Sequence, residues 1–370
     1  MEAQTLTFTR TDSCDLLLGA DIFAGAATRL ARRRSRRRCA LITNEVVGRF
    51  HLEPLTAALR EAGLDVVQLV IPDGEAHKTP QVALDLVARL LDLRLDRGCP
   101  VVGLGGGVIG DLAGFVAATC LRGLPFAFFP TSLLAMVDAC LGGKVAVNLP
   151  AGKNLLGVFR QPQLVAIDVA TLRTLPLTQL GYGLVEALKH GLIADAAYFR
   201  FLAKGADAIK RRDPAFMQRV VRRSLNIKKT YVVADEREEG IRAHLNLGHT
   251  FGHALEHLGH YVRHSHGEAV GLGLLLALEV SRRLGHLRED YRPALTAVLE
   301  AFNLPTRVPR AYDVDTLLAA MASDKKNRET SWRLVLPRAI GEVDLVPATA
   351  EVLRPALEAA LRDLGEAPLA

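Results

Sequence analysis

A histidine-rich stretch at residues 238–268 contains the side chains best suited to chemistry, with seven of the chain's eleven histidines. Within it, His249, His253 and His257 recur at every fourth position, and His266 follows a loop and begins another apolar segment. Residues four apart share one face of a helix, and neutral imidazole is the most common metal ligand in proteins. One histidine from each segment could therefore bind a divalent ion together with a carboxylate from elsewhere. The alternative is a set of surface and core histidines on an amphipathic helix.

A candidate for that carboxylate is Glu186, in the segment 177–193, which has the apolar pattern of a helix. Lys189 lies three residues further on, so both charged side chains are expected on one face that is otherwise apolar. A buried carboxylate and a buried ammonium group both need partners. The two could form a structural ion pair, or Glu186 could be the third ligand of the metal.

The elements that must position these residues differ between the two halves of the chain. The first half predicts strands at 39–43, 66–71, 100–104, 126–129 and 164–168, and helices at 55–62, 81–93 and 133–139. This β-α-β-α-β alternation indicates a parallel sheet, and the pattern over 6–18 adds strands that begin a mixed sheet. The second half is helical, as at 214–232, until a predicted hairpin at 332–336 and 341–346.

Three consecutive glycines, Gly105, Gly106 and Gly107, lie between a predicted strand and an apolar helix. Such a turn lets the backbone approach a diphosphate and points helix N-terminal NH groups at it. Ligands of parallel sheets bind beyond the carboxyl ends of strands, where Asn44 and the segment 75–78 also fall. The turn therefore predicts a dinucleotide site, with tight packing as the alternative, because its spacing differs from the Rossmann fingerprint.

The segment 138–154 is unusually polar for a connection. Lys144, Asn148, Lys153 and Asn154 stand there among glycines and small apolar residues. This composition predicts a ligand-binding loop, and a solvated loop is the alternative.

Composition limits the possible partners. A net charge of +6 suits an anionic small molecule. The arginines between residues 29 and 38 lack interleaved aromatic residues, which favours a solvated face over a nucleic-acid patch.

Five scattered cysteines without a Cys-x-x-Cys pair argue against disulfides and a thiolate metal site. Apolar runs such as 269–278 are too short to span a membrane, and no secretion signal is evident, so we expect a cytoplasmic protein.

Several motifs occur together in the order found in one family: GGGVIGD, PTSLLAMVD, GGK followed by GKN, E-x-x-K, ADEREEG-x-R, LNLGHTFGHALE, HGEAV and DKKN. On these motifs the chain resembles, nearly end to end, the 3-dehydroquinate synthases, which are sugar phosphate cyclases of the shikimate pathway. The resemblance implies an α/β plus all-α fold. It places a Rossmann-like parallel-sheet NAD-binding domain at residues 1–176 and an α-helical metal- and substrate-binding domain at residues 177–370. It also implies a homodimer.

The resemblance implies roles for individual residues. Zn²⁺ or Co²⁺ would be bound by Glu186, His249 and His266. NAD would contact Thr43, Asn44, Glu75, Lys78, Gly106, Gly107, Val108, Asp111, Thr131, Ser132, Lys153, Thr171, Leu172, Arg173 and Thr174. An anionic substrate would lie between the halves, held by Arg122, Asp138, Lys144, Asn154, Lys189, Lys228, Arg242, Asn246, His253 and one lysine of the pair Lys325 and Lys326. The catalytic set would comprise Glu238 and His253, which match positions of proton transfer, together with Lys144, Arg242 and Asn246.

The implied activity is that of a carbon–oxygen lyase that converts 3-deoxy-D-arabino-heptulosonate 7-phosphate to 3-dehydroquinate and phosphate. NAD first oxidises a secondary alcohol, which makes a neighbouring proton acidic enough for phosphate to be eliminated. The hydride is then returned, the ring opens, and an intramolecular aldol step closes the carbocycle, so NAD ends unchanged. The metal would serve as a Lewis acid, and lysines with Arg242 would neutralise the anionic groups.

Two adjacent residues depart from the family loop GGK-Thr-Gly-Val-Asn. Val145 and Ala146 replace its threonine and glycine beside Lys144, which adds bulk and removes a hydroxyl. The change is consistent with a related cyclase acting on another sugar phosphate, whereas the retained Lys228 and Arg242 favour a substrate with a carboxylate. A metal-dependent polyol dehydrogenase of the same superfamily is the other enzyme alternative, but it would not need so many anion-binding residues.

Overall fold

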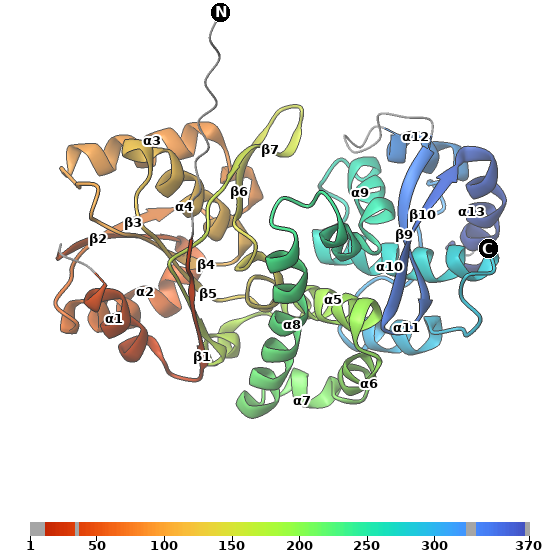
Figure 1. Cartoon of the computed structure of the whole chain (residues 1–370), viewed down its shortest axis with the longest axis horizontal. Helices are drawn as coiled ribbons and strands as arrows, with labels where there is room; N and C mark the ends of the chain where they lie inside the picture. Colours follow the sequence, from red (N-terminus) through yellow and green to blue (C-terminus); the bar gives the residue numbers. More distant parts are fainter. Residues whose placement is uncertain (1–11, 34–36, 323–330, 367–370) are drawn as a thin grey trace, which may run out of the picture. The chain divides into compact units, whose positions relative to one another are not determined.

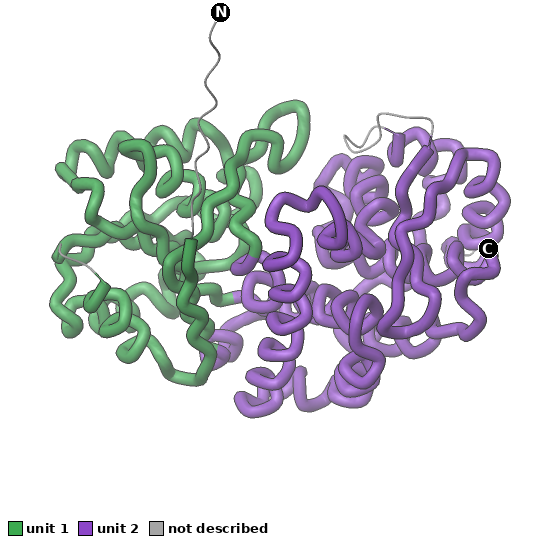
Figure 2. The backbone as a smooth tube through the Cα atoms, in the orientation of Figure 1, with its two compact units in different colours: residues 1–131, 142–168 green, residues 132–141, 169–370 purple. Residues whose placement is uncertain are grey.

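The computed structural model describes residues 12–33, 37–322 and 331–366, and the chain forms two compact units (Figure 1 and Figure 2). The first unit comprises the chain up to Thr131 together with Gly142–Asp168. The second comprises Ser132–Leu141 together with the chain from Val169 onward. Asp138 therefore belongs to the second unit, although the segments before Ser132 and after Leu141 belong to the first.

The first unit contains a six-stranded sheet with the strand order β1-β8-β5-β4-β2-β3. Its strands are β1 (Asp15–Gly19), β2 (Arg38–Asn44), β3 (Asp65–Ile71), β4 (Val101–Gly105), β5 (Phe126–Pro130) and β8 (Leu164–Asp168). All residues of β4, β5 and β8 are buried, as expected for central strands covered on both faces. The fold class predicted from the sequence is confirmed. A mixed sheet was expected, but every pairing among the described strands of this sheet is parallel, and residues 6–11 of the predicted strands lie outside the described residues.

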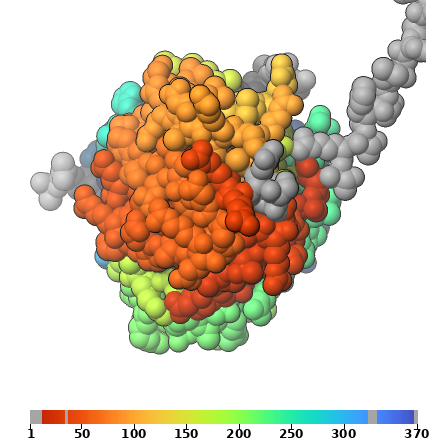
Figure 3. All heavy atoms as spheres, turned by 90° about the vertical axis from the view of Figure 1, so that its left-hand side faces the viewer, coloured from red at the N-terminus to blue at the C-terminus, as the bar shows by residue number. Residues whose placement is uncertain are grey.

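Helices cover both faces of this sheet. They are α1 (Phe23–Arg32), α2 (Glu45–Glu61), α3 (Pro80–Asp92) and α4 (Gly107–Thr119), with short 3-10 turns η1 (Glu75–His77) and η2 (Cys120–Arg122). α1 packs against α2, and α3 packs against α4 on the other side of the strands (Figure 1). In the space-filling view of Figure 3, the early part of this unit, in red and orange, forms most of the surface that faces the viewer.

Helix α2 begins ten residues earlier than the sequence predicts. Asn44 ends β2 and also caps α2, because its side-chain oxygen accepts a hydrogen bond of 2.8 Å from the backbone nitrogen of Val47. The prediction started the helix only after Pro54, but Pro54 lies inside the observed helix. The strand therefore leads directly into the helix without the longer turn that was expected.

The predicted ligand loop after residue 143 is instead a β-hairpin. Strands β6 (Lys144–Leu149) and β7 (Gly152–Phe159) pair in antiparallel register. Val145 of β6 packs against α4 at Gly114, where a side chain would overlap it. The composition suggested a loop because glycine, lysine and asparagine are poor strand formers, but pairing and packing against α4 override that local preference.

The second unit is mainly helical. Its elements are the π-helical turn η3 (Ala135–Ala139), the 3-10 turns η4 (Val169–Thr174) and η5 (Ile241–Asn246), and the helices α5 (Leu177–Ala194), α6 (Ala196–Lys204), α7 (Ala206–Lys210), α8 (Pro214–Ala234), α9 (His249–Leu258), α10 (His266–Arg283), α11 (Arg292–Ala301), α12 (Val314–Ala322) and α13 (Ala350–Leu364). The predicted hairpin is confirmed as β9 (Ser331–Ala339) and β10 (Glu342–Thr349). Almost every residue of α10 is buried, and α5, α9, α11 and α13 pack around it.

Candidate active site

Helix α5 places two charged side chains in the interior of the second unit. Glu186 and Lys189 are both buried, and the Lys189 ammonium forms an ion pair with Oε2 of Glu186. α5 approaches η3 closely because position 183 is glycine, where any side chain would collide with the backbone of Leu134. This close approach brings Asp138, on η3, to the polar part of α5.

Helices α9 and α10 each present a histidine at their first position, His249 and His266. A capping box between Ser265 and Glu268 starts α10 at His266. The helices approach closely, because a side chain at Gly273 of α10 would collide with the backbone of the residue that precedes α9. Close packing of the two helices therefore sets the separation of the two imidazoles.

The structure brings Glu186, His249 and His266 together, with one potential ligand atom of each lying within 4.8 Å of the others. Oε1 of Glu186 lies 3.6 Å from Nε2 of His249 and 3.6 Å from Nε2 of His266. This buried oxygen accepts no hydrogen bond from the described residues. Tetrahedral ligands at zinc distances lie roughly 3.4 Å apart, so the three donors fit one ion and leave a coordination position open.

The two histidines of this cluster differ in protonation. Nδ1 of His249 lies 3.2 Å from the carbonyl oxygen of Leu247, so an Nδ1 proton can be donated there while Nε2 remains a ligand. Burial and then the charge of Lys189 hold the pKa of His249 well below its usual range. Burial also opposes protonation of His266, but the adjacent carboxylates of Glu186 and Glu256 outweigh it and raise the pKa of His266 to about 10. In the metal-free protein, a proton on His266 therefore supplies positive charge to the cluster.

Glu186 remains ionised in this environment. Burial by itself would raise the pKa of its carboxyl group, but Lys189, His249 and His266 together hold that pKa below its usual range. A carboxylate that stays ionised at neutral pH is available as a metal ligand without first losing a proton.

A second charged cluster lies around Asp138. Nζ of Lys228, on α8, donates to the backbone carbonyl of Asp138 at 2.6 Å and to its Oδ1 at 2.7 Å. Nε2 of buried His190 lies 3.7 Å from the same Oδ1. Burial opposes ionisation of Asp138, but Lys228 and Lys189 hold its pKa well below the usual value. These contacts join Asp138 and Lys228, and the charge of Lys189 acts on the same carboxylate. All three are residues predicted to bind substrate.

The segment before α9 holds further predicted residues. Nδ2 of Asn246 donates a hydrogen bond of 2.5 Å to Oε1 of Glu238. Arg242 is buried and donates to the backbone carbonyl of Glu236. Asp235 accepts hydrogen bonds of 2.8 Å and 3.0 Å from the backbone nitrogens of Gly240 and Arg242, which stabilises this turn.

His253 lies beside the candidate metal ligands. Its ring centre is 5.5 Å from that of His249 and 6.4 Å from that of His266. His257, in contrast, lies against Tyr261 with ring centres 6.2 Å apart. Of the three histidines at four-residue spacing, two therefore reach the cluster and the third faces a different neighbour.

In the first unit, a group around Lys78 connects three of the predicted ligand-binding residues. Nζ of buried Lys78 lies 2.5 Å from Oδ2 of Asp111 and 2.5 Å from Oδ1 of Asn154. Glu75 accepts a hydrogen bond of 2.7 Å from Nδ2 of Asn148 on the β6–β7 hairpin. The hairpin and the turn after β3 are therefore joined by polar contacts near the N-terminal end of α4.

The other predicted NAD residues occupy strand ends and helix starts. Thr43 is buried and donates to the carbonyl of Leu104 at 2.8 Å, and Asn44 donates to Asp73. The backbone nitrogen of Thr131 donates to the carbonyl of Gly105 at 2.9 Å, beside the predicted glycine turn. Gly106, Gly107 and Val108 form the N-terminal end of α4, Lys153 lies on β7, Ser132 precedes η3, and Thr171, Leu172, Arg173 and Thr174 lie in η4.

The remaining predicted substrate residues are distributed over other parts of the chain. Lys144 is exposed at the start of β6, and Arg122 ends η2 with a left-handed φ of 66°. Lys325 and Lys326 lie outside the described residues.

Two buried residues near the site were not predicted from the sequence, His190 and Glu256. His190 follows Lys189 directly in a helix that is apolar on all sides, so its position next to Asp138 depends on the packing of η3. Glu256 is part of the motif LNLGHTFGHALE, and its Oε2 lies 3.4 Å from Nδ1 of His266. The signal for Glu256 was its spacing of seven residues from His249, which places both on one face of a helix.

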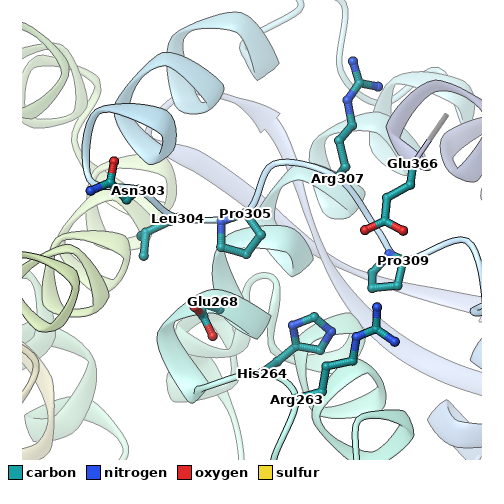
Figure 4. A pocket seen from close by; sticks show the side chains of 9 residues that line it. All are labelled: Arg263, His264, Glu268, Asn303, Leu304, Pro305, Arg307, Pro309 and Glu366. Atoms are coloured by element: carbon teal, nitrogen blue, oxygen red, sulfur yellow. The ribbon is translucent and has the colours of Figure 1, made fainter. Parts of the chain in front are cut away.

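A cavity of about 430 Å³ lies elsewhere in the second unit (Figure 4). Its lining includes Arg263, His264, Glu268, Arg307 and Glu366, and it includes none of the predicted site residues. This cavity is therefore not lined by the candidate metal ligands or by the other predicted site residues.

The fold and the site define a class of protein in which a parallel α/β unit is joined to a helical unit with a candidate metal site of two histidines and one carboxylate. The 3-dehydroquinate synthase N-terminal family model matches residues 68–181, and the 3-dehydroquinate synthase C-terminal model matches residues 183–327. The chain belongs to the 3-dehydroquinate synthase family.

A relative named 3-dehydroquinate synthase, from Methylococcus capsulatus, is 46% identical over 319 residues, which is 86% of this chain and 88% of the relative. Among solved structures, 2-epi-5-epi-valiolone synthase from Streptomyces hygroscopicus with NAD⁺ and Zn²⁺ bound is 28% identical, with a TM-score of 0.88 over 97% of this chain and all of the other (100%). A 2-deoxy-scyllo-inosose synthase, at 24% identity and a TM-score of 0.83 over 94% of this chain and 96% of the other, shares the fold. Within the described part of the chain, we find no helix with the length and apolarity needed to cross a membrane.

Proposed function

We propose that the chain converts 3-deoxy-D-arabino-heptulosonate 7-phosphate to 3-dehydroquinate and phosphate, the activity for which its family is named. The observation that carries this proposal is the position of Lys189 in the second unit. Lys189 forms an ion pair with Glu186 of the candidate metal cluster, and its charge also acts on Asp138 of the neighbouring cluster. A metal site and an anion-binding site therefore adjoin, as a reaction on a phosphorylated sugar acid requires.

Glu186, His249 and His266 would hold Zn²⁺ or Co²⁺, and the solved valiolone synthase contains Zn²⁺ together with NAD⁺. When bound, the ion would supply Lewis-acid polarisation of an oxygen at the reacting carbon. The unpartnered Oε1 of Glu186 supports this role, because a buried carboxylate oxygen without a hydrogen bond gains most from a cation.

Positive side chains would bind the anionic groups of the substrate. Lys189, Lys228 and Arg242 are buried, so their charges are weakly screened and attract a phosphate or carboxylate strongly. Asp138 holds Lys228 at 2.7 Å and would keep its ammonium directed into the site. Arg122, Lys144, Asn154 and one lysine of the pair Lys325 and Lys326 would complete this set.

Glu238 and His253 would transfer protons. The hydrogen bond of 2.5 Å from Asn246 orients the Glu238 carboxylate, which would accept a proton from the substrate. His253 lies next to His249 and His266, where its imidazole would transfer a proton to or from the substrate beside the candidate metal ligands. Asn246 would thus orient the base, while Arg242 would stabilise the negative charge that develops.

NAD would bind in the α/β part of the chain, residues 1–176, and the metal and substrate mainly in residues 177–370. The N-terminal end of α4 at Gly106, Gly107 and Val108 offers backbone NH groups for a diphosphate. Thr43, Asn44, Glu75, Lys78, Asp111, Thr131, Ser132, Lys153 and residues 171–174 would supply the other contacts. We further propose a cytoplasmic homodimer, as the family resemblance implies.

The experiment that tests this function uses catalytic NAD. Enzyme, metal, a small amount of NAD and the seven-carbon substrate are mixed, and phosphate and NADH are followed together. Because the hydride is returned within one active site, phosphate should appear in large excess over NAD while NADH does not accumulate. A polyol dehydrogenase would accumulate NADH and release no phosphate, which would refute the proposal.

Another sugar phosphate cyclase remains the competing function, because of Val145 and Ala146. Both side chains are buried, and Val145 lies against Gly114 of α4. The added bulk is therefore accommodated in the packing of the first unit, and the preference for a carboxylate-bearing substrate rests on the retained Lys228 and Arg242. If sedoheptulose phosphate turned over and that substrate did not, the metal and NAD assignments would stand while the named reaction would be wrong.

A further inference from the structure

Glu256 is a buried carboxylate next to the candidate metal cluster but is not one of the three ligands. It lies on α9, two helical turns after His249, and only 3% of its surface is exposed. Oε2 of Glu256 lies 3.4 Å from Nδ1 of His266 on α10. Burying a carboxylate is unfavourable unless it is hydrogen-bonded or paired, so this contact calls for an explanation.

The two nitrogens of His266 face two different carboxylates. Nε2 lies 3.6 Å from Oε1 of Glu186, and Nδ1 lies 3.4 Å from Oε2 of Glu256. A neutral imidazole carries its proton on only one nitrogen. If Nδ1 donates its proton to Glu256, the lone pair of Nε2 is directed toward Glu186, where the ion would lie.

The approach of α9 to α10 makes this contact possible. A side chain at Gly252 of α9 would press on the carbonyl oxygen of Ala269 of α10, at 3.1 Å. Glu256 lies one turn after Gly252, so the close approach at the glycine brings its carboxylate within reach of the first turn of α10. The position of His266 at the start of that turn is set separately by the capping box of Ser265 and Glu268.

His249 is oriented in a different way. Its Nδ1 lies 3.2 Å from the carbonyl oxygen of Leu247, which is an uncharged acceptor. A carboxylate acceptor adds a negative charge and makes the imidazole a stronger donor to a cation than a carbonyl does. The two histidines of the cluster should therefore depend to different degrees on their acceptors.

We propose that Glu256 is a positioning residue that accepts the Nδ1 proton of His266, orients Nε2 toward the metal and raises metal affinity through its charge. The inference rests on the metal site proposed above and deepens it. The competing explanation is a purely structural contact that ties α9 to α10. A structural contact would affect unfolding without changing the affinity or the spectrum of the bound ion.

The test compares Glu256→Gln, which keeps the size and an acceptor oxygen but removes the charge, with the unmodified full-length protein. Co²⁺ affinity is measured by competition with a chromophoric chelator, and the absorption spectrum of the Co²⁺ protein is recorded. We expect Glu256→Gln to weaken Co²⁺ binding about 10- to 100-fold and to shift the Co²⁺ absorption bands. The matched control is Glu279→Gln, which changes another buried carboxylate, one that pairs with arginines on the later part of α10 and on α11, and should leave the Co²⁺ affinity within about threefold.

A second measurement reads the histidine directly. In the Zn²⁺ protein, nitrogen-detected NMR of the imidazoles should show the proton of His266 on Nδ1, and this proton should move upfield in Glu256→Gln as the hydrogen bond weakens. A folded Glu256→Gln protein with unchanged Co²⁺ affinity and spectrum would overturn the inference. If the unmodified protein did not bind Co²⁺ and could not be distinguished from Glu186→Gln, the proposed metal site itself would be overturned.

Discussion

The polar cluster of the second unit and that of the first are built in opposite ways. In the second, Glu186 presents a buried oxygen that has no hydrogen bond among the described residues, facing two imidazole nitrogens at 3.6 Å. In the first, the Lys78 ammonium lies 2.5 Å from both Asp111 and Asn154, so its charge is already compensated. The Glu186 cluster is therefore completed by a cation. The Lys78 cluster, in contrast, must exchange existing contacts when a ligand binds.

This difference sets the expected size of the mutational effects. Lys189 balances the charge of Glu186, but Oε1 accepts no hydrogen bond and the candidate site has three protein ligands, so loss of one donor removes the function of the site. The cluster around Lys78 can relax around a substitution and retain part of its affinity. The predictions below run from the largest expected effect to the smallest.

Replacing His249 or Glu186 with Ala should abolish stoichiometric metal binding and turnover, because only three protein ligands are available. Metal content of the purified proteins is measured by atomic emission. The control is His257→Ala on the same helix, which faces Tyr261 and should retain the metal. Equimolar zinc in both variants would show that these residues are not the ligands.

Asp111→Asn should weaken NAD binding by about tenfold, which corresponds to about 1.4 kcal/mol, because it removes the nearer charged partner of buried Lys78 and leaves Glu75 at 3.9 Å. NAD affinity is measured by calorimetric titration with the metal-loaded protein. Asp85→Asn, an exposed position on α3, is the matched control. If Asp111→Asn abolished NAD binding as completely as Glu186→Ala abolishes metal binding, the two clusters would not differ in the way described.

The thermal stability of the metal-free protein should depend on pH through His266. Its pKa is raised from 6.5 to about 10 in the folded protein, so its stabilising contribution is complete below pH 6.5 and is lost as pH rises through about 10. Bound metal replaces the proton, so the gain in Tm on metal loading should increase by a few degrees between pH 6.5 and 9.

Scanning calorimetry at several pH values measures this trend. His266→Gln should abolish the pH dependence of the metal-free protein, and His257→Gln should preserve it. A gain in Tm that is independent of pH would mean that His266 is already neutral without the metal.

The smallest effect is expected for the arginine run. Arg32 and Arg37 are exposed, whereas Arg29 and Arg33 both pair with Asp15 at 2.7 Å. The double substitution Arg32→Ala and Arg37→Ala should leave kcat/KM within about twofold, because exposed charges are well screened by water. Steady-state kinetics at two salt concentrations measures the effect, and a large loss of activity in a folded variant would assign this surface a role in catalysis.

The sequence by itself determined the local elements and the types of chemistry. Hydrophobic periodicity predicted the strands of the parallel sheet, the long helices α5 and α8 and the C-terminal hairpin, because these patterns depend on neighbouring residues. The family motifs then supplied the reaction. Asn44 as a helix cap and the β6–β7 hairpin were missed, since each depends on how the chain continues or pairs beyond a short window.

Only the tertiary structure decided which side chains meet. Four-residue spacing could not distinguish His257, which faces Tyr261, from His253, which lies beside the candidate ligands. The sequence also could not show that Glu186 reaches His249, which lies more than sixty residues later, or that Glu256 reaches His266. These contacts arise where glycines let α5, α9, α10 and η3 approach closely, and such packing between distant segments leaves no periodic signal in the sequence.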